Sequence, residues 1–314
     1  MIQTMGMMES ENEGTHDLMK AKIGDEADPV EFIVTEEEAW SHAFANDDYN
    51  PWYMEDSPFG GRIAPPTFLA PLEARVTWSY YAHPPGGTMN AKQEFQFINP
   101  LKIGKKIKIT AKLVDWYRKR DRNYFVFEYL TVDEDGLEII RTRRTRINPV
   151  VATERPPANE EIRKSGERSD PTAFKPMKIT ASRETEVGFE LEPITKEMTL
   201  DKTRIFHGWP WVRGVHTDYT DAHKGGLRQP ILQANQIYEQ IGEMLVKFFG
   251  EGYLGGNLSV TVVRKMEPDL EVTTKGIVRE KVVEGDAIRL ILDVWCENES
   301  GETIIAGAAS GLVR

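Results

Sequence analysis

The alternation of apolar and polar residues predicts a helix followed by strands in the first half of the chain. Residues 67–81 are rich in apolar and aromatic side chains and predict a helix, which the prolines Pro65-Pro66 would open. Residues 107–113 alternate apolar side chains with lysine and threonine, the period-two pattern of a half-buried strand. Residues 124–132 continue as a β-prone run, and Asp135-Gly136 after it is typical of a hairpin turn.

A shorter helix is expected before this region. Thr35 and Glu38 have the spacing of a capping box, in which each side chain satisfies a free N–H group at the helix start. We therefore predict a helix through residues 39–46. Residues 47–64 are polar, aromatic, and rich in glycine and proline, so we expect a structured loop there.

The second half of the chain repeats this order. Residues 209–237 resemble residues 46–72, and residues 263–313 resemble residues 98–147. Tyr53 falls opposite His216, Pro66 opposite Pro230, Pro100 opposite Pro268 and Asp135-Gly136 opposite Ser300-Gly301. A repeat of this length indicates duplication of a whole domain, and its helix is expected at residues 231–249.

The fold class expected from this order is α+β, with a long helix wrapped by an antiparallel sheet in each unit. A chain of 314 residues has room for two such domains. We place an acidic tail at residues 1–28, a domain at 29–150, a Pro-, Arg-, Glu- and Ser-rich linker at 151–187, and a second domain at 188–314. The two units are expected to pair as a pseudo-dimer.

Charge and composition narrow the possible functions. The net charge of −11 argues against nucleic acid as a partner. The arginine-rich run at residues 141–146 is the exception, and it fits either the solvent face of a strand or a patch that binds phosphates. No apolar run is long enough to span a bilayer, and the N-terminus lacks the pattern of a secretory signal. The single cysteine, Cys296, excludes an intrachain disulfide and favours a packed residue in a reducing cytoplasm.

The densest group of potential metal ligands surrounds His216. It comprises His207, His216, His223, Asp218 and Asp221. Their spacing matches no defined zinc motif, so we expect no metal, and no nicotinamide or flavin cofactor is indicated.

Two segments of the first half resemble a known family. Residues 48–53 read Asp-Tyr-Asn-Pro-Trp-Tyr, and residues 63–69 read Ile-Ala-Pro-Pro-Thr-Phe-Leu. With the turn at Pro100–Gly104, they are similar to the motifs of the MaoC-like dehydratase and (R)-specific enoyl-CoA hydratase family in its double hot-dog form. The resemblance implies a hydro-lyase that hydrates a 2-enoyl thioester or dehydrates a 3-hydroxyacyl thioester, with CoA or a carrier protein as the handle.

The resemblance also implies which groups act. A carboxylate and an imidazole from one short loop flank a water molecule, and N–H groups at a helix start polarise the thioester oxygen. This chain departs from that pattern in both copies. The first copy keeps Asp48 and Asn50 but has Tyr53 at the histidine position, whereas the second keeps His216 but has Trp211 at the aspartate position.

The candidate site residues follow from this comparison. The catalytic candidates are His216 as acid or base, Asp218 as its carboxylate partner, and Asp48 in the first copy. The N–H groups near residues 229–232 are expected to polarise the thioester. The candidate substrate-binding residues are Arg213, Trp211, Tyr53, Asn50, Gln229 and Ile231.

Several alternatives remain open from sequence alone. The aromatic residues Trp209, Trp211 and Tyr219 either plug an unused pocket or form a flat wall for a bulky or aromatic acyl group. Because the aspartate and histidine are split between the copies, a non-catalytic subunit that binds acyl thioesters or pairs with an active hot-dog partner is a second hypothesis. A hot-dog thioesterase using Glu73 or Glu239 is a third. A homodimer is compatible with all three.

Overall fold

The computed structural model describes residues 14–149, 180–208 and 213–314. Its main element is a ten-stranded sheet in the order β2-β5-β6-β7-β4-β9-β12-β11-β10-β8, with antiparallel pairing between neighbours. The strands are β1 (His16–Asp17), β2 (Glu26–Ile33), β3 (Tyr81–Ala82), β4 (Met89–Phe97), β5 (Lys106–Lys119), β6 (Arg122–Asp133), β7 (Glu138–Asn148), β8 (Ile194–Met198), β9 (Asn257–Val262), β10 (Leu270–Glu284), β11 (Ala287–Asn298) and β12 (Thr303–Val313).

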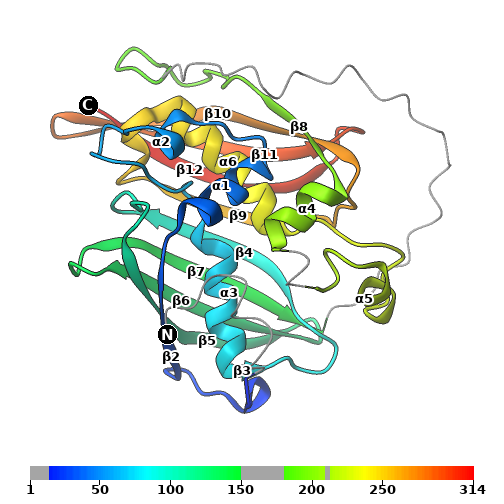
Figure 1. Ribbon diagram of the computed structural model, residues 1–314. Helices are drawn as coiled ribbons and strands as arrows, with labels where there is room; N and C mark the ends of the chain where they lie inside the picture. Colours follow the sequence, from blue (N-terminus) through cyan, green and yellow to red (C-terminus); the bar gives the residue numbers. More distant parts are fainter. Residues whose placement is uncertain (1–13, 150–179, 209–212) are drawn as a thin grey trace.

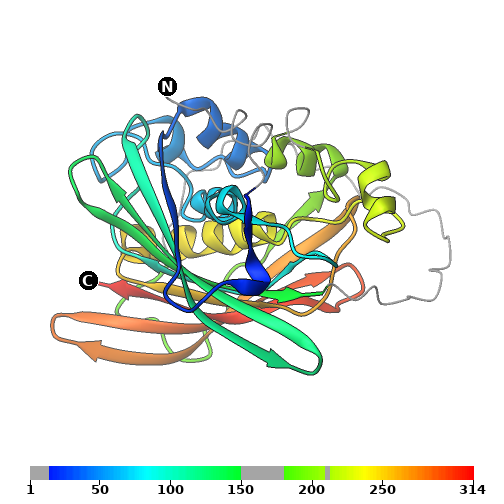
Figure 2. The same cartoon turned by 90° about the horizontal axis from the view of Figure 1, so that it is seen from below.

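Two long helices lie side by side on one face of this sheet, and the shorter helices lie above them (Figures 1 and 2). The helices are α1 (Glu36–Phe44), α2 (Pro51–Met54), α3 (Leu69–Tyr80), α4 (Leu200–His207), α5 (Tyr219–Lys224) and α6 (Ala234–Phe249), with 3-10 turns at Leu18–Lys20 and Gly250–Tyr253. The apolar core fills the space between α3, α6 and the sheet. No helix in the described ranges is long and apolar enough to cross a membrane.

Most local predictions for the first half agree with the structure, but the first helix spans Glu36–Phe44 instead of residues 39–46, and the expected loop at residues 47–64 contains α2. Thr35 and Glu38 form the capping box at the start of α1. The β6–β7 hairpin turns at Asp135-Gly136, and the β11–β12 hairpin turns at Ser300-Gly301. Helix α3 begins at Leu69, later than the prolines, because residues 65–68 form a turn in which the Phe68 N–H donates to the Pro65 carbonyl at 3.1 Å.

A pseudo-twofold relation links the two halves, and β4 and β9 join them into one sheet. Equivalent backbone hydrogen bonds fix the start of each long helix. The Ile63 N–H donates to Trp52 and the Ile231 N–H to Val215, while Ala64 donates to Leu101 and Leu232 to Met266.

These bonds correct the alignment of the prolines. Ile63 corresponds to Ile231, so Pro66 matches Ala234 and not Pro230. The loop from His216 to Ile231 is longer than its counterpart because it contains α5. For the same reason α6 begins at Ala234 rather than at Ile231, since the Ile231 and Leu232 N–H groups are bound outside the helix.

The structure also revises the ends of the expected tail and linker. Residues 14–28 belong to the folded body, since Leu18 is fully buried and β1 pairs with β3 beside it. The expected linker ends earlier than residue 187, because the N–H groups of Thr180 and Ala181 donate to the Phe248 carbonyl at the end of α6. Residues 1–13 and 150–179, the rest of the expected tail and linker, lie outside the described residues.

Candidate functional site

The loop of the first half buries Asp48, the catalytic candidate of the first copy. Asp48 is 1 % exposed and accepts hydrogen bonds from the Tyr53 hydroxyl at 3.1 Å and the Asn50 backbone N–H at 3.2 Å. Asn50 caps α2, with its side-chain oxygen accepting from the Trp52 N–H at 3.0 Å. Tyr53, which lies opposite His216 in the repeat, therefore binds the Asp48 carboxylate of its own loop.

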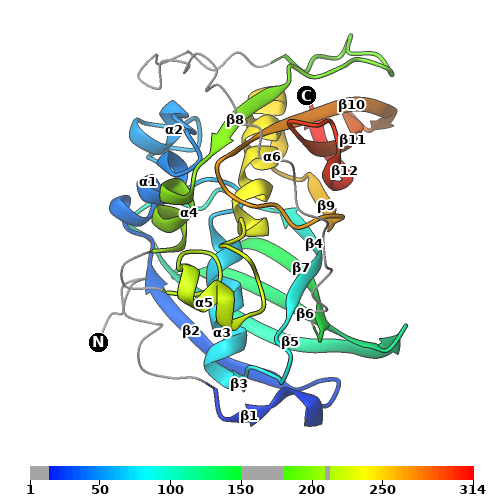
Figure 3. The same cartoon turned by 90° about the vertical axis from the view of Figure 1, so that its right-hand side faces the viewer.

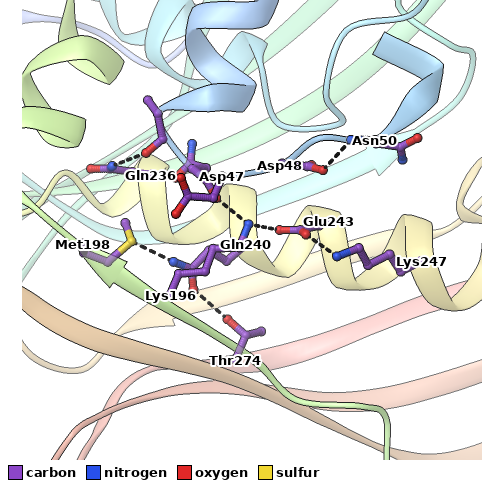
Figure 4. Close-up of polar contacts among 12 residues, drawn as sticks. Asp47, Asp48, Asn50, Lys196, Met198, Gln236, Gln240, Glu243, Lys247 and Thr274 are labelled. Carbon is purple, nitrogen blue, oxygen red and sulfur yellow. Dashed lines mark hydrogen bonds and ion pairs between the residues drawn. The ribbon is translucent and has the colours of Figure 1, made fainter. Parts of the chain in front are cut away.

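The surroundings of Asp48 come from the other half of the chain (Figure 4). Lys196 of β8 donates to Glu243 of α6 and to the Asn46 carbonyl, and Lys247 also donates to Glu243. Burial, followed by the nearby charge of Glu243, raises the pKa of Asp48 to about 8. Burial likewise raises the pKa of Tyr53 well above its ordinary value. At neutral pH neither group is prepared to remove a proton from water.

The two helix glutamates considered for a thioesterase are both held by buried partners. Glu239 accepts from His42 at 3.1 Å and from Thr67. Glu73 accepts from Thr142, from Gln93 at 3.3 Å and from Arg144 at 3.3 Å. Burial raises the pKa of Glu73 to about 7, with Arg144 opposing that shift.

The second-half loop holds its imidazole in one tautomer. Nδ1 of His216 lies 2.9 Å from the Ile231 carbonyl oxygen. Because a carbonyl only accepts hydrogen bonds, Nδ1 carries the proton and Nε2 carries the lone pair. Burial lowers the pKa of His216, so the ring is neutral near pH 7. A neutral imidazole with a fixed tautomer is suited to act as a general base through Nε2.

A second histidine accompanies His216. The His207 ring, at the end of α4, lies with its centroid 5.4 Å from that of His216 at an interplanar angle of 62°. The Gln233 amide lies 3.2 Å from Nδ1 of His207. Burial, with smaller contributions from His216 and Arg75, lowers the pKa of His207 to about 3. Sequence reasoning placed His207 only among possible metal ligands, because the approach of α4 to this loop is a tertiary contact.

The expected carboxylate partner of His216 is engaged elsewhere. Asp218 caps α5 by accepting from the N–H groups of Thr220 at 2.8 Å and Asp221 at 3.1 Å. It also accepts from Arg213 at 2.6 Å, and this hydrogen bond lowers the pKa of Asp218. No hydrogen bond between Asp218 and His216 is present in the described parts of the chain.

The remaining residues that the sequence singled out do not gather at one site in the described part of the chain. Gln229 donates to Glu267 at 2.8 Å, and Nε2 of His223 lies 2.8 Å from the Arg228 carbonyl. Within the described ranges, no three potential metal ligands gather at one point. Tyr219 is exposed, Cys296 is buried beside Thr274, and Trp209 and Trp211 lie outside the described residues. The N–H groups of Ile231 and Leu232, expected to polarise the thioester, donate to backbone carbonyls.

Comparisons with known proteins identify families and structures that this chain resembles. Residues 21–141 match a family model described as FAS1-like, dehydratase domain region. No curated protein matches the chain. Among solved structures, a MaoC-like dehydratase superposes with a TM-score of 0.73 at 17% identity, covering 94% of this chain and 99% of that one.

Two further structures cover nearly the whole chain. A putative MaoC domain protein dehydratase from Chloroflexus aurantiacus gives a TM-score of 0.65 at 12% identity, covering 97% of this chain and 98% of its own. A conserved hypothetical protein from Mycobacterium tuberculosis with a double hot-dog fold gives 0.59 at 10% identity, covering 95% and 98%. This chain is a double hot-dog protein. The comparisons confirm the double hot-dog fold that the sequence predicted. They also confirm the resemblance of the chain to the MaoC-like dehydratases.

Proposed function

We propose that the double hot-dog protein is a hydro-lyase that hydrates a 2-enoyl thioester or dehydrates a 3-hydroxyacyl thioester, with the chemistry in the second-half loop. The observation that carries the proposal is the hydrogen bond from Nδ1 of His216 to the Ile231 carbonyl. It gives the residue at the family's histidine position a fixed tautomer and an available Nε2 lone pair. The dehydratase-region match of the first half supports the reaction class.

A single imidazole is sufficient for the proton transfers. In hydration, Nε2 of His216 takes a proton from water while the water oxygen bonds to C3 of the enoyl group. The C2–C3 π electrons move toward the thioester carbonyl as the enolate forms. The imidazolium then returns its proton to C2, so that water has been added and His216 is neutral again. Dehydration is the reverse sequence.

We assign a structural role to Asp48 in this proposal. Its carboxyl group is enclosed by Tyr53, Asn50 and the Lys196–Glu243 pair, and it favours the protonated form. The same enclosure favours the second candidate function, a subunit that binds acyl thioesters without turning them over. The buried partners of Glu73 and Glu239 argue against the thioesterase hypothesis.

We infer further that the handle is CoA or a carrier protein and that no cofactor takes part. The buried, unpaired Cys296 supports a reducing cytoplasm as the location. The β4–β9 pairing already joins two hot-dog units within one chain. A homodimer or a paired hot-dog subunit is therefore an additional level of assembly. Light scattering of the purified protein measures the molar mass that distinguishes a monomer from a dimer.

The test is the loss of enoyl-thioester absorbance with a panel of aliphatic and aromatic trans-2-enoyl-CoA substrates. The wild type is compared with His216→Ala and Asp48→Asn. His223→Ala is the matched control, because His223 is an exposed histidine of the same loop region whose contacts are the Arg228 carbonyl and the ring of the exposed Tyr219. Activity lost in His216→Ala alone supports the proposal. Activity lost in Asp48→Asn alone transfers the chemistry to the first half, and no turnover by the wild type favours the binding function.

A further inference from the structure

The arginine-rich run divides between the two faces of β7. Arg141 and Arg143 point to solvent and pair with Glu138 and Glu128. Arg144 and Arg146 point inward, toward the helices, and are 0% and 6% exposed. The strand-face interpretation from sequence therefore holds for alternate residues only, and two guanidinium groups lie inside the first hot-dog unit.

The partners of Arg144 do not satisfy its whole guanidinium group. It donates to Gln93 at 2.5 Å, to the Ala70 carbonyl at 2.6 Å and to Glu73 at 3.3 Å. Its Nη1 atom is buried and has no hydrogen-bond partner among the described residues. Glu73 is the carboxylate that pairs with Arg144 beside the second buried arginine, and burial weakens its ionisation.

Arg146 is held by weaker contacts. Its guanidinium group lies over the Trp78 ring at 4.7 Å, and Nη1 is 3.5 Å from the Thr88 hydroxyl. A side-chain hydrogen bond with Tyr129 also favours the charged form of Arg146. In the part of the chain that the structure describes, its Nε atom is buried without a hydrogen-bond partner, as is the hydroxyl of Tyr238 in α6. Burial and the charge of Arg144 lower the pKa of Arg146 to about 10, which still leaves it charged at neutral pH. Buried charges of this kind are normally paired with an anion.

The corresponding place in the second half carries no charge. Across the β4–β9 seam, Gln93 pairs with both Arg144 and Val260, and Val260 pairs in turn with Gly307. The pseudo-twofold relation therefore puts Gly307 opposite Arg144 and Ala309 near Arg146. The excess positive charge is a property of the first hot-dog unit and not of the fold.

This charge lies on the side of the molecule where the His216 loop meets the first unit. Arg75, on α3 between Glu73 and Trp78, is close enough to lower the pKa of His207, whose ring contacts His216. Gln233, at the start of α6, binds His207, and Tyr238 follows one turn later. Figure 3 views the molecule from the side on which α5 lies, with α3 and α6 behind it.

We propose that the acyl group of the substrate carries a second, anionic carboxylate, which the unpartnered donors of Arg144, Arg146 and Tyr238 bind while the thioester lies at His216. This inference rests on the proposed function, since it names the substrate class of the same site. A carboxylate suits these groups because guanidinium N–H groups only donate hydrogen bonds and a tyrosine hydroxyl can donate one. The CoA phosphates lie a whole pantetheine arm away from the reacting carbons, so we assign the bound anion to the acyl part of the substrate.

The experiment uses saturated thioesters, which hydration cannot consume, so that binding is measured apart from turnover. Isothermal titration calorimetry of the full-length protein compares succinyl-CoA with butyryl-CoA, which has a methyl group in place of the carboxylate, and with CoA alone. We expect succinyl-CoA to bind about tenfold or more tightly than butyryl-CoA, the size of effect that a buried charge-assisted hydrogen bond produces. Arg146→Met should reduce succinyl-CoA to the butyryl-CoA level and leave CoA unchanged.

Arg143→Met is the matched control, because it removes an arginine of the same strand on the solvent face, and it should change none of the three affinities. Equal wild-type affinities for succinyl-CoA and butyryl-CoA would overturn the inference, and this comparison needs no folded variant. An equal loss of all three ligands in Arg146→Met would also overturn it, because the charge would then serve the handle. Preferential succinyl-CoA binding without any turnover would keep the carboxylate site while rejecting the hydro-lyase.

Discussion

The two loops of this double hot-dog protein occupy equivalent places and have opposite characters. In the first, Asp48 and Tyr53 bind each other in a buried network supplied by the other half of the chain. In the second, His216 is held through Nδ1 by a backbone carbonyl, and Asp218, its expected carboxylate partner, caps α5. The comparison teaches that one of two equivalent loops can be locked into a buried polar network while the other holds an imidazole in one tautomer.

The most direct test of the difference between the two loops is to remove the imidazole of the second one. We expect His216→Ala to lower kcat/KM by about 10²–10⁴-fold, the usual contribution of a general acid–base group, while the melting temperature changes little. Steady-state kinetics on the best substrate of the enoyl-CoA panel measures this. A similar loss in His223→Ala would contradict it.

The largest stability effect is expected at the ion pair beside the first loop. Within the described residues, Lys196→Met leaves the buried Glu243 with Lys247 as its one paired cation, so the free energy of unfolding should fall by about 3–5 kcal/mol. Urea unfolding measures the change. Lys275→Met breaks a more exposed pair with Glu297 and should cost no more than about 1 kcal/mol. Equal losses in the two variants would show that the Lys196 pair is not special.

The protonation of Asp48 predicts a smaller, pH-dependent effect. Because its pKa in the folded protein is about 8 instead of 3.8, the folded state binds a proton that the unfolded state has released between these pH values. This contribution to stability is therefore greatest at the acidic end and is lost as the pH rises toward 8. The unfolding free energy of the wild type should decline with pH relative to Asp48→Asn between pH 5 and 8. A constant difference would refute the prediction.

The smallest effect concerns one hydroxyl group. Tyr53→Phe removes the hydrogen bond to Asp48 and leaves a buried acceptor short of a donor, which should cost about 1–3 kcal/mol. Activity should be unaffected if the chemistry belongs to His216. Chemical denaturation and kinetics on the same preparation test both statements, and a loss of activity without a loss of stability would return Tyr53 to the list of functional residues.

Much of the fold was predictable because its signals are local. The capping box at Thr35, the alternation in residues 107–113 and the turn at Asp135-Gly136 each depend on neighbouring residues, and each has its expected structure. The alignment of Pro66 with Pro230 failed because α5 lengthens the second loop, which a match of prolines does not reveal.

The site was less predictable because its contacts join distant segments. Lys196 reaches Glu243 from another element, and His207 approaches His216 only when α4 is packed in place. Asp218 was expected to serve His216, yet an aspartate at a helix start is satisfied by the free N–H groups of that helix. The inward direction of Arg144 and Arg146 depends on the strand register, which the run of arginines alone does not fix.

The β4–β9 seam has a consequence for how such a protein can change over generations. In a dimer of identical hot-dog subunits, every substitution appears in both sites at once, so a residue that damages catalysis damages all of it. Here the seam lies within one chain, and each position in one half is inherited separately from its counterpart. A tyrosine could replace a histidine in one loop, and arginines could enter one strand, without any matching change in the other half.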